Sequence, residues 1–191
     1  MRGVGIAAGG ASTAAGLRSG DAAAGAMEII PAEVAPVILM VNGQKRALKI
    51  EPRVTLLRAL RNSLDLTGTK QICDRGSCGG CTVLVDGERV NSCMTLALDV
   101  VGKKIETVEG VAQGDELHPV QKAFCEFDAL QCGFCTPGFV VASKSICDRA
   151  KATGVVPTRE QIKQELSGNI CRCGTYNRVF DAIEKVVGQK A

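Results

Sequence analysis

The sequence has few aromatic residues: they make up 3% of its 191 residues, and tryptophan is absent. The core must therefore be built from Ala, Val, Leu and Ile side chains. The net charge is only +3 and there is no arginine-rich run, which argues against a nucleic-acid partner. No segment approaches the ~20 consecutive apolar residues of a membrane-spanning helix. The length suits one domain or two small ones, since domains commonly have ~100–150 residues.

The first 36 residues differ in composition from the rest of the chain. Residues 1–26 are mostly Ala and Gly with few large side chains, so they can bury little apolar surface and are not expected to fold alone. The stretch ends in "AAAGA", small residues of the kind found at the cleavage site of an export signal. We therefore expect residues 1–36 to be either a flexible tail or the remnant of an export signal.

The next part, residues 37–113, has the pattern of a small sheet crossed by one helix. Asn42-Gly43 and Asp86-Gly87 each join two apolar-rich runs, and both residue types tolerate the positive φ of a tight hairpin turn. Leucines at helical spacing follow Thr55, which is available as an N-cap. The expected elements are a hairpin over 37–50, a helix over 54–64, a hairpin over 82–90 and a strand over 104–111.

The last part, residues 114–191, has helical patterns instead. Pro137 at the first position of a helix and Thr136 as its N-cap would form one helix start. Thr158 and Gln161 form a capping box at another. The expected helices cover 118–127, 137–150, 158–166 and 177–187, which predicts a bundle and a domain boundary near residue 113.

Ten cysteines are far more than packing requires, and four of them lie in the first part of the chain. Three have the spacing C-x4-C-x2-C, and the fourth follows the second hairpin. This is the plant-type ferredoxin pattern for a [2Fe-2S] cluster. Glycines within the motif would let the backbone turn tightly and bring N–H groups towards the sulfurs of a cluster. The predicted ligands are Cys73, Cys78, Cys81 and Cys93, and the glycines are Gly76, Gly79 and Gly80.

A second group of four cysteines lies in the helical part. Cys132 and Cys135 precede one predicted helix, while Cys171 and Cys173 follow another. A helix start and a helix end can meet in a bundle, so four thiolates would converge on one centre. Two cysteine pairs are also a zinc pattern, although C-x-C is unusual in structural zinc sites. Iron–sulfur and zinc chemistry both remain open for this group on spacing alone.

Other roles for the cysteines have less support. Disulfides would matter if the chain is exported to an oxidising compartment, but clustered triplets with intervening glycines suit a metal centre better. Cys125 and Cys147 lie outside both groups, each on a predicted helix among apolar neighbours, and we expect both to be buried free thiols. His118 is the only histidine, so a Rieske centre, which needs two, is excluded within this chain. We expect it at a helix start on the surface.

Three ordered motifs carry a family resemblance. They are "GTKQICDRGSCGGCTVLVDGERVNSCMTLA" (68–97), "LQCGFCTPGFV" (130–140) and "GNICRCGTY" (168–176). Together they resemble the small iron–sulfur subunit of the xanthine oxidase family of molybdenum hydroxylases, and the similarity runs from residue 37 to the end. Two positions depart from the family pattern: Ile72 stands where Gly is usual, and Gly80 where Ala is commoner.

The resemblance implies an α+β chain: a β-grasp plant-type ferredoxin domain followed by an all-α four-helix-bundle domain, each holding one [2Fe-2S] cluster. It also implies a large partner subunit that holds a molybdenum-pterin cofactor and hydroxylates the substrate. Electrons would pass through the two clusters to a partner that carries FAD or to a cytochrome with haem. By position, Gln131 and Cys173 match residues that approach the pterin.

Within the family, "CRCGTY" and the leader-like N-terminus resemble the branch of periplasmic aldehyde oxidoreductases and isoquinoline oxidoreductases. This branch implies an aldehyde substrate and a periplasmic location, although relatives there are exported with a twin-arginine leader and none is present in this sequence. A cytoplasmic location is the alternative. A stand-alone ferredoxin-like carrier and a zinc-stapled binding module are the other two functional hypotheses.

Overall fold

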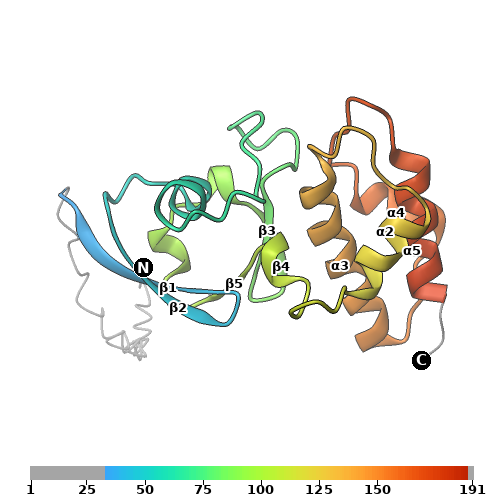
Figure 1. Cartoon of the computed structure of the whole chain (residues 1–191), viewed down its shortest axis with the longest axis horizontal. Helices are drawn as coiled ribbons and strands as arrows, with labels where there is room; N and C mark the ends of the chain where they lie inside the picture. The colour runs from blue at the N-terminus through green and yellow to red at the C-terminus, as the bar shows by residue number, and fades with distance from the viewer. Residues whose placement is uncertain (1–32, 189–191) are drawn as a thin grey trace, which may run out of the picture.

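The computed structural model describes residues 33–188, in two parts that lie side by side (Figure 1). One part is a small sheet with a short helical segment, and the other consists of helices. Residues 1–32 of the expected tail or export signal lie outside the described residues.

The first part is a five-stranded mixed sheet with the order β2-β1-β5-β3-β4. β1 and β5 are parallel, and the other neighbours are antiparallel. Both predicted hairpins are confirmed, and their turn residues Asn42, Gly43, Asp86 and Gly87 all have positive φ. The strands are β1 (Ala35–Val41), β2 (Gln44–Ile50), β3 (Thr82–Val85), β4 (Glu88–Asn91) and β5 (Lys104–Glu106).

The predicted helix after the first hairpin is confirmed, but it is not a regular α-helix. Thr55 is its N-cap, since its Oγ1 accepts a hydrogen bond from the backbone N–H of Arg58 at 3.4 Å. A short α-helical turn, α1 (Leu56–Arg58), continues as a wider π-helical turn, η1 (Ala59–Ser63). Buried residues of both turns pack against the apolar face of the sheet and form the core of this part.

The last predicted strand is shorter than expected, and the prediction of a strand over 104–111 is wrong beyond Glu106. At this point Asn42 of the first hairpin turn accepts a hydrogen bond from the backbone N–H of Thr107 at 2.9 Å and donates one to its Oγ1 at 3.0 Å. These bonds end the ladder, and the chain continues as a 3-10 turn, η4 (Val108–Gly110). Two further 3-10 turns are η2 (Ser92–Met94) and η3 (Leu98–Val100).

The four predicted helices of the second part are confirmed, and two of them, expected over 137–150 and 177–187, begin one residue earlier than expected. The capping box of Thr158 and Gln161 is present. Thr136 is the first residue of its helix and Cys135 (φ −84°, ψ −14°) occupies the N-cap position, so the prediction of Thr136 as N-cap is wrong. The helices are α2 (Pro119–Glu126), α3 (Thr136–Thr153), α4 (Arg159–Glu165) and α5 (Tyr176–Gly188).

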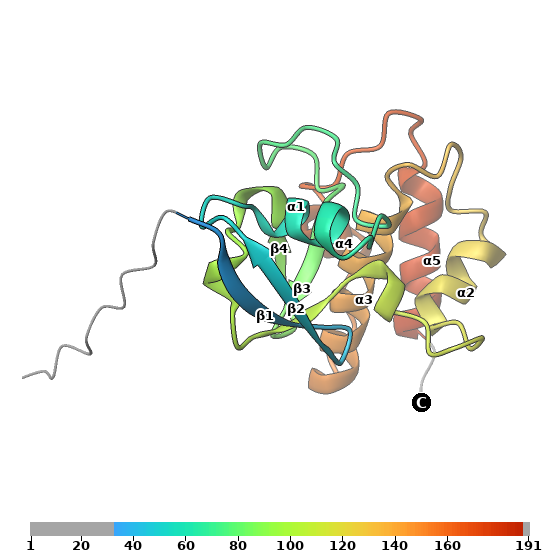
Figure 2. The ribbon, with the colours of Figure 1, turned by 60° about the vertical axis from the view of Figure 1, so that its left-hand side comes forward.

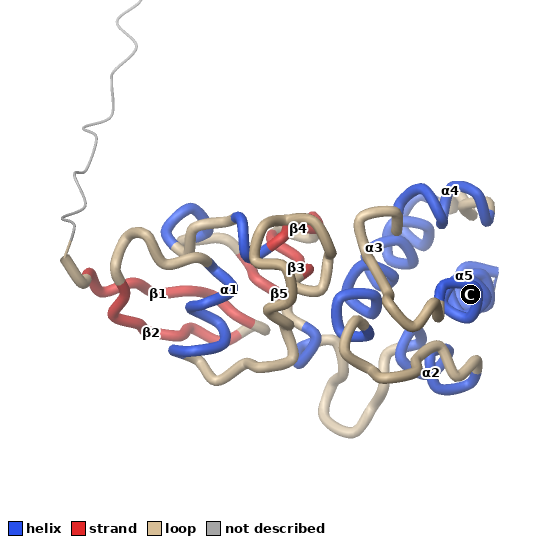
Figure 3. Tube along the Cα trace, turned by 90° about the horizontal axis from the view of Figure 1, so that it is seen from above, coloured by secondary structure: helices blue, strands red, loops and turns tan. Residues whose placement is uncertain are grey.

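Helix α3 connects the two parts, because it packs against β3 and β4 on one side and against α2 and α5 on the other (Figure 3). Leu84 of β3 belongs to the helical core. Arg89 of β4 donates 3.0 Å hydrogen bonds to both the backbone oxygen and the carboxylate of Glu165 at the end of α4. Within the described residues, no helix is long and apolar enough to cross a membrane.

Candidate metal centres

The loops that carry the cysteines gather on one side of the molecule. The loop before β3, the loop between α2 and α3 and the loop between α4 and α5 lie close together there (Figures 1 and 2). The three loops are separated in sequence but adjacent in the fold. This arrangement brings together the two halves of the second cysteine group, whose thiols interact with each other.

The first group lies in the loop before β3 and in η2. Cys78, Cys81 and Cys93 are buried, and Cys73 is half-buried. The loop can turn around them because Gly76 (φ 74°) has the left-handed conformation that glycine adopts without strain. All four predicted ligands of this group therefore lie in one compact loop and the turn next to it.

Backbone N–H groups point at the sulfurs of the first group. The N–H of Gly76 donates to Cys93 Sγ at 3.2 Å, and that of Ser77 donates to Cys73 Sγ at 3.3 Å. The N–H of Arg75 lowers the pKa of Cys73 to about 7, with a further contribution from the Cys78 thiol. Such donors stabilise thiolate, which is the form that binds a metal. Gly76 therefore contributes one N–H donor to a sulfur of this group.

The sulfurs of the first group interact in two pairs. The thiols of Cys73 and Cys78 act on each other, and so do those of Cys81 and Cys93. Burial raises the pKa of Cys93 to about 12, and the neighbouring Cys81 thiol adds to the rise. Each pair therefore consists of two neighbouring thiols.

The second group is also arranged in two pairs, Cys132 with Cys173 and Cys135 with Cys171. Burial raises the pKa of Cys135 to about 12, and the Cys171 thiol contributes. Cys171 is buried, whereas Cys132 and Cys173 are exposed. One pair therefore faces the interior and the other faces solvent.

Tyr176, the first residue of α5, supports this second group. Its hydroxyl accepts a 2.7 Å hydrogen bond from the backbone N–H of Cys171. Its ring packs edge-on against Phe139 of α3 and is stacked on Phe180, with centroids 6.0 and 6.4 Å apart. The only tyrosine in the sequence thus connects the C-x-C loop to the helical core.

The paired thiols fit a two-iron cluster better than a single zinc ion. Within residues 33–188, no three Cys, His, Asp or Glu side chains converge closely enough to hold one metal ion. A [2Fe-2S] cluster instead needs two thiolates for each of its two irons. The hydroxyls of Thr69, Thr136 and Thr175 are buried near the cysteine loops and have no hydrogen-bond partner within the described residues. Unpaired buried donors of this kind fit a site that holds further acceptor atoms, such as sulfide.

The two groups touch directly through their backbones. The N–H of Ile170, one residue before Cys171, donates to the carbonyl oxygen of Cys78 at 2.9 Å. The buried Asn169 donates through its side chain to the oxygen of Gly79 at 3.0 Å. Gly138 of α3 lies so close to this loop that a Cβ there would be 2.3 Å from the same Gly79 oxygen. The hydrogen bond from Ile170 to Cys78 therefore connects the two cysteine groups, because Cys78 belongs to the first and Ile170 directly precedes Cys171 of the second.

Sequence reasoning missed Asn169, Ile170 and Gly138 as residues of this contact. All three stand within or next to the cysteine motifs, but their partners are 58 residues or more away along the chain. Of the remaining predicted residues, Gln131 is exposed and directly precedes Cys132. Gly80 is buried at the same contact.

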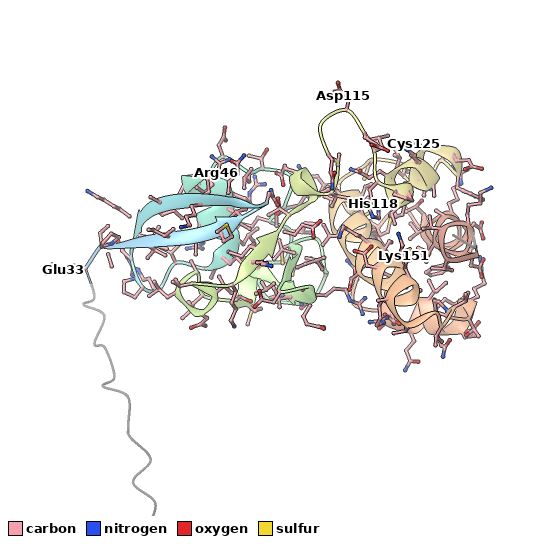
Figure 4. All side chains as sticks on the ribbon, turned by 90° about the horizontal axis from the view of Figure 1, so that it is seen from below. Glu33, Arg46, Asp115, His118, Cys125 and Lys151 are labelled. Atoms are coloured by element: carbon pink, nitrogen blue, oxygen red, sulfur yellow. The ribbon has the colours of Figure 1, made fainter. Side chains whose placement is uncertain are left out.

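The two cysteines outside both groups differ from each other. Cys147 is buried in α3, and burial raises its pKa to about 12. The prediction that Cys125 is buried is wrong, because it is exposed on α2 (Figure 4), whose core face is formed by Val120, Ala123 and Phe124. None of the ten cysteines, all of which lie in the described part of the chain, forms a disulfide.

His118 is at a helix start, as predicted, and it is half-buried there as the N-cap of α2. Its Nδ1 accepts a hydrogen bond from the N–H of Val120 at 3.3 Å. Burial lowers its pKa. The histidine therefore has a structural role at this helix end.

Comparison with known proteins agrees with this geometry. Residues 39–106 match the 2Fe-2S iron-sulfur cluster binding domain, and residues 107–184 match the [2Fe-2S] binding domain. The chain is 45% identical over 168 residues to the aldehyde oxidoreductase iron-sulfur-binding subunit PaoA of Escherichia coli O157:H7, covering 82% of this chain and 73% of that protein.

Two solved structures are also similar. Quinoline 2-oxidoreductase from Pseudomonas putida 86 has 42% identity and a TM-score of 0.76, with 82% of this chain and 95% of that chain covered. The aldehyde oxidoreductase from Desulfovibrio desulfuricans has 38% identity and a TM-score of 0.74, with 80% of this chain and 17% of that chain covered. The fold and the two matched domains define an iron–sulfur protein of the [2Fe-2S] type. The chain belongs to the iron–sulfur subunits of the molybdenum hydroxylases, in the xanthine oxidase family.

Proposed function

We propose that this chain conducts electrons between a molybdenum-pterin centre in a large partner subunit and an FAD or haem group in another partner. The observation that carries the proposal is the contact between the two cysteine groups, where Ile170 N–H donates to the Cys78 oxygen at 2.9 Å. A bound [2Fe-2S] cluster takes up and releases one electron at a time. Two cysteine groups joined by one hydrogen bond suit an electron-transfer protein better than a protein with two independent structural metal sites.

We interpret the sheet with its α1–η1 segment as a β-grasp ferredoxin domain and helices α2–α5 as a four-helix bundle. The order β2-β1-β5-β3-β4, with β1 and β5 parallel at its centre, supports the first interpretation. Mutual packing of α5 with α2, α3 and α4 supports the second.

We assign the eight paired cysteines as the cluster ligands. Gly76 supplies an N–H donor to one sulfur of the first group, and Gly79 and Gly80 form the backbone that the second part of the chain contacts. The first cluster is assigned to Cys73, Cys78, Cys81 and Cys93, and the second to Cys132, Cys135, Cys171 and Cys173.

The exposed side of the second group is the part that would face the molybdenum subunit. Cys132 and Cys173 are exposed there, beside Gln131, and the apolar side chains of Phe134 and Ile170 are also largely exposed. We assign Gln131 and Cys173 as contacts of the pterin. The aldehyde oxidoreductase of Desulfovibrio desulfuricans, of which this chain covers only 17%, supports the need for a large partner. We infer that in the complex of this chain separate subunits take the place of the remaining part of that longer chain.

We propose an aldehyde as the substrate of the complex, because both an aldehyde oxidoreductase subunit and an aldehyde oxidoreductase structure are among the similar proteins. An N-heterocycle is the second candidate, favoured by the likeness to quinoline 2-oxidoreductase.

We also propose a periplasmic location, with export directed by residues 1–36. Fractionation of cells that express the protein at its native level tests it, and recovery from the cytoplasm alone would contradict it.

Purification of a tagged chain from its native host tests the proposed partnership. We expect it to copurify with a large subunit in a complex that contains molybdenum, iron and either FAD or haem. Adding an aldehyde to the complex should reduce the iron–sulfur signals, and adding quinoline would do so instead if the substrate is an N-heterocycle. A chain that purifies alone, with its signals unaffected by either compound, would favour the stand-alone carrier. A chain that holds zinc without iron would favour the binding module.

A further inference from the structure

Two glycines of the first cysteine loop are each covered by an apolar side chain. A Cβ added to Gly80 would lie 2.3 Å from Cδ1 and 3.0 Å from Cγ1 of Ile72, and 3.8 Å from Cys78 Sγ. A Cβ added to Gly76 would lie 3.0 Å from Cγ and 3.8 Å from Sδ of Met94. Both side chains therefore rest on backbone that only glycine leaves open to them.

Packing of the fold does not explain the positions of these two side chains. Ile72 is 45% exposed and Met94 is 65% exposed, and neither belongs to a hydrophobic core of the described residues. Each instead adjoins a predicted ligand, since Ile72 precedes Cys73 and Met94 follows Cys93. Those cysteines belong to different thiol pairs, so each pair has one largely exposed apolar residue next to it in the sequence.

We propose that Ile72 and Met94 form an apolar cover that limits the access of water to the first cluster and so lowers its reduction potential. This inference rests on the assignment of Cys73, Cys78 and their partners as cluster ligands. Reduction adds one negative charge to the cluster, and water stabilises the more highly charged state. Excluding water with apolar side chains therefore disfavours the reduced state. Ile72 and Gly80 are also the two positions at which the sequence departs from the family pattern, and the structure places them in contact.

Truncation of the cover tests the proposal directly. In Ile72→Ala and in Met94→Ala, measured on the purified chain or complex with its clusters, we expect the reduced-to-oxidised ratio of the first cluster to rise at least threefold at a fixed ambient potential. A threefold rise corresponds to about 28 mV, because tenfold is 59 mV for a one-electron couple. After exchange into deuterated water, the deuterium coupling at the first cluster should also increase, while the second cluster stays unchanged.

A matched control is Ile38→Ala, since Ile38 is also a largely exposed isoleucine, 58% exposed, and lies on β1, outside the cysteine loops. It should leave both potentials and the deuterium coupling as they are. If Ile72→Ala and Met94→Ala have no more effect than Ile38→Ala, the cover does not exist.

The contact between Ile72 and Gly80 makes a second, independent test. Gly80→Ala should push Ile72 off the loop and raise the potential, because the added methyl occupies the place of its Cδ1. In the Ile72→Ala background the same change should add nothing, since the conflicting atoms are gone. An equal shift from Gly80→Ala in both backgrounds would overturn the proposal. Cys78→Ser distinguishes failure of the cover from a wrong ligand assignment. If Cys78→Ser leaves the signal of the first cluster intact, the ligand assignment is wrong. If it alters that signal while the Ile72 and Met94 variants have no effect, only the apolar cover is refuted.

Discussion

At the scale of single residues, the environment of each cysteine distinguishes the eight paired thiols from the other two. The paired thiols lie in loops or at helix ends, where backbone N–H groups are free to reach sulfur, as those of Gly76 and Ser77 do. Cys125 and Cys147 lie within helices, where the backbone N–H groups are used by the helix itself. The same residue type therefore has two roles, set by the backbone around it.

Replacing Cys173 by serine tests this division. We expect Cys173→Ser to remove or distort the second cluster and to leave the signal of the first. The loss of iron affinity should be at least the ~10–100-fold that accompanies loss of a supporting group around a metal ligand. Electron paramagnetic resonance of the reduced protein measures both signals. Cys125→Ser is the matched control and should change neither signal; the opposite result for the two variants would show that the ligand assignment is wrong.

At the scale of elements, the start of α3 docks on the first cysteine loop, and this contact depends on a missing side chain. A Cβ at Gly138 would lie 2.3 Å from the Gly79 oxygen and 3.1 Å from Gly80 Cα, which are backbone atoms that cannot rotate away. Asn169 reinforces the same contact from the loop between α4 and α5. The two parts of the chain are thus held in a fixed relation at the point where their cysteine groups meet.

Gly138→Ala should push the start of α3 away from the first cysteine loop. We expect it to destabilise the protein by about 1–3 kcal/mol, the usual cost of forcing extra atoms into a packed site. The urea dependence of the visible absorption of the clusters measures the effect. Gly168→Ala is the control, because a Cβ at this exposed position meets nothing within 4 Å, and it should change stability by less than about 0.5 kcal/mol. Equal stability of the two variants would contradict the packing argument.

At the scale of the whole molecule, features set by neighbouring residues could be predicted and features set by distant residues could not. The Asn-Gly turn and the capping box at Thr158 follow from local chemistry, and both are present. The end of β5 depends on Asn42, whose partner Thr107 is 65 residues away. The strand predicted from local sequence is therefore longer than the observed one. The contact of Asn169 with Gly79 spans 90 residues and had no local signal. The cysteine groups were predictable because metal ligands impose a spacing on the sequence itself.

The most direct test of the central claim is electron paramagnetic resonance of the fully reduced protein, combined with iron and acid-labile sulfide analysis of the same sample. Two [2Fe-2S] clusters predict four irons and four sulfides per chain, and two distinct rhombic signals of equal intensity. The sites lie close together across the bond from Ile170 to Cys78, so the two signals should also show magnetic interaction at low temperature. One signal with two irons, or zinc in place of iron in either group, would contradict the account.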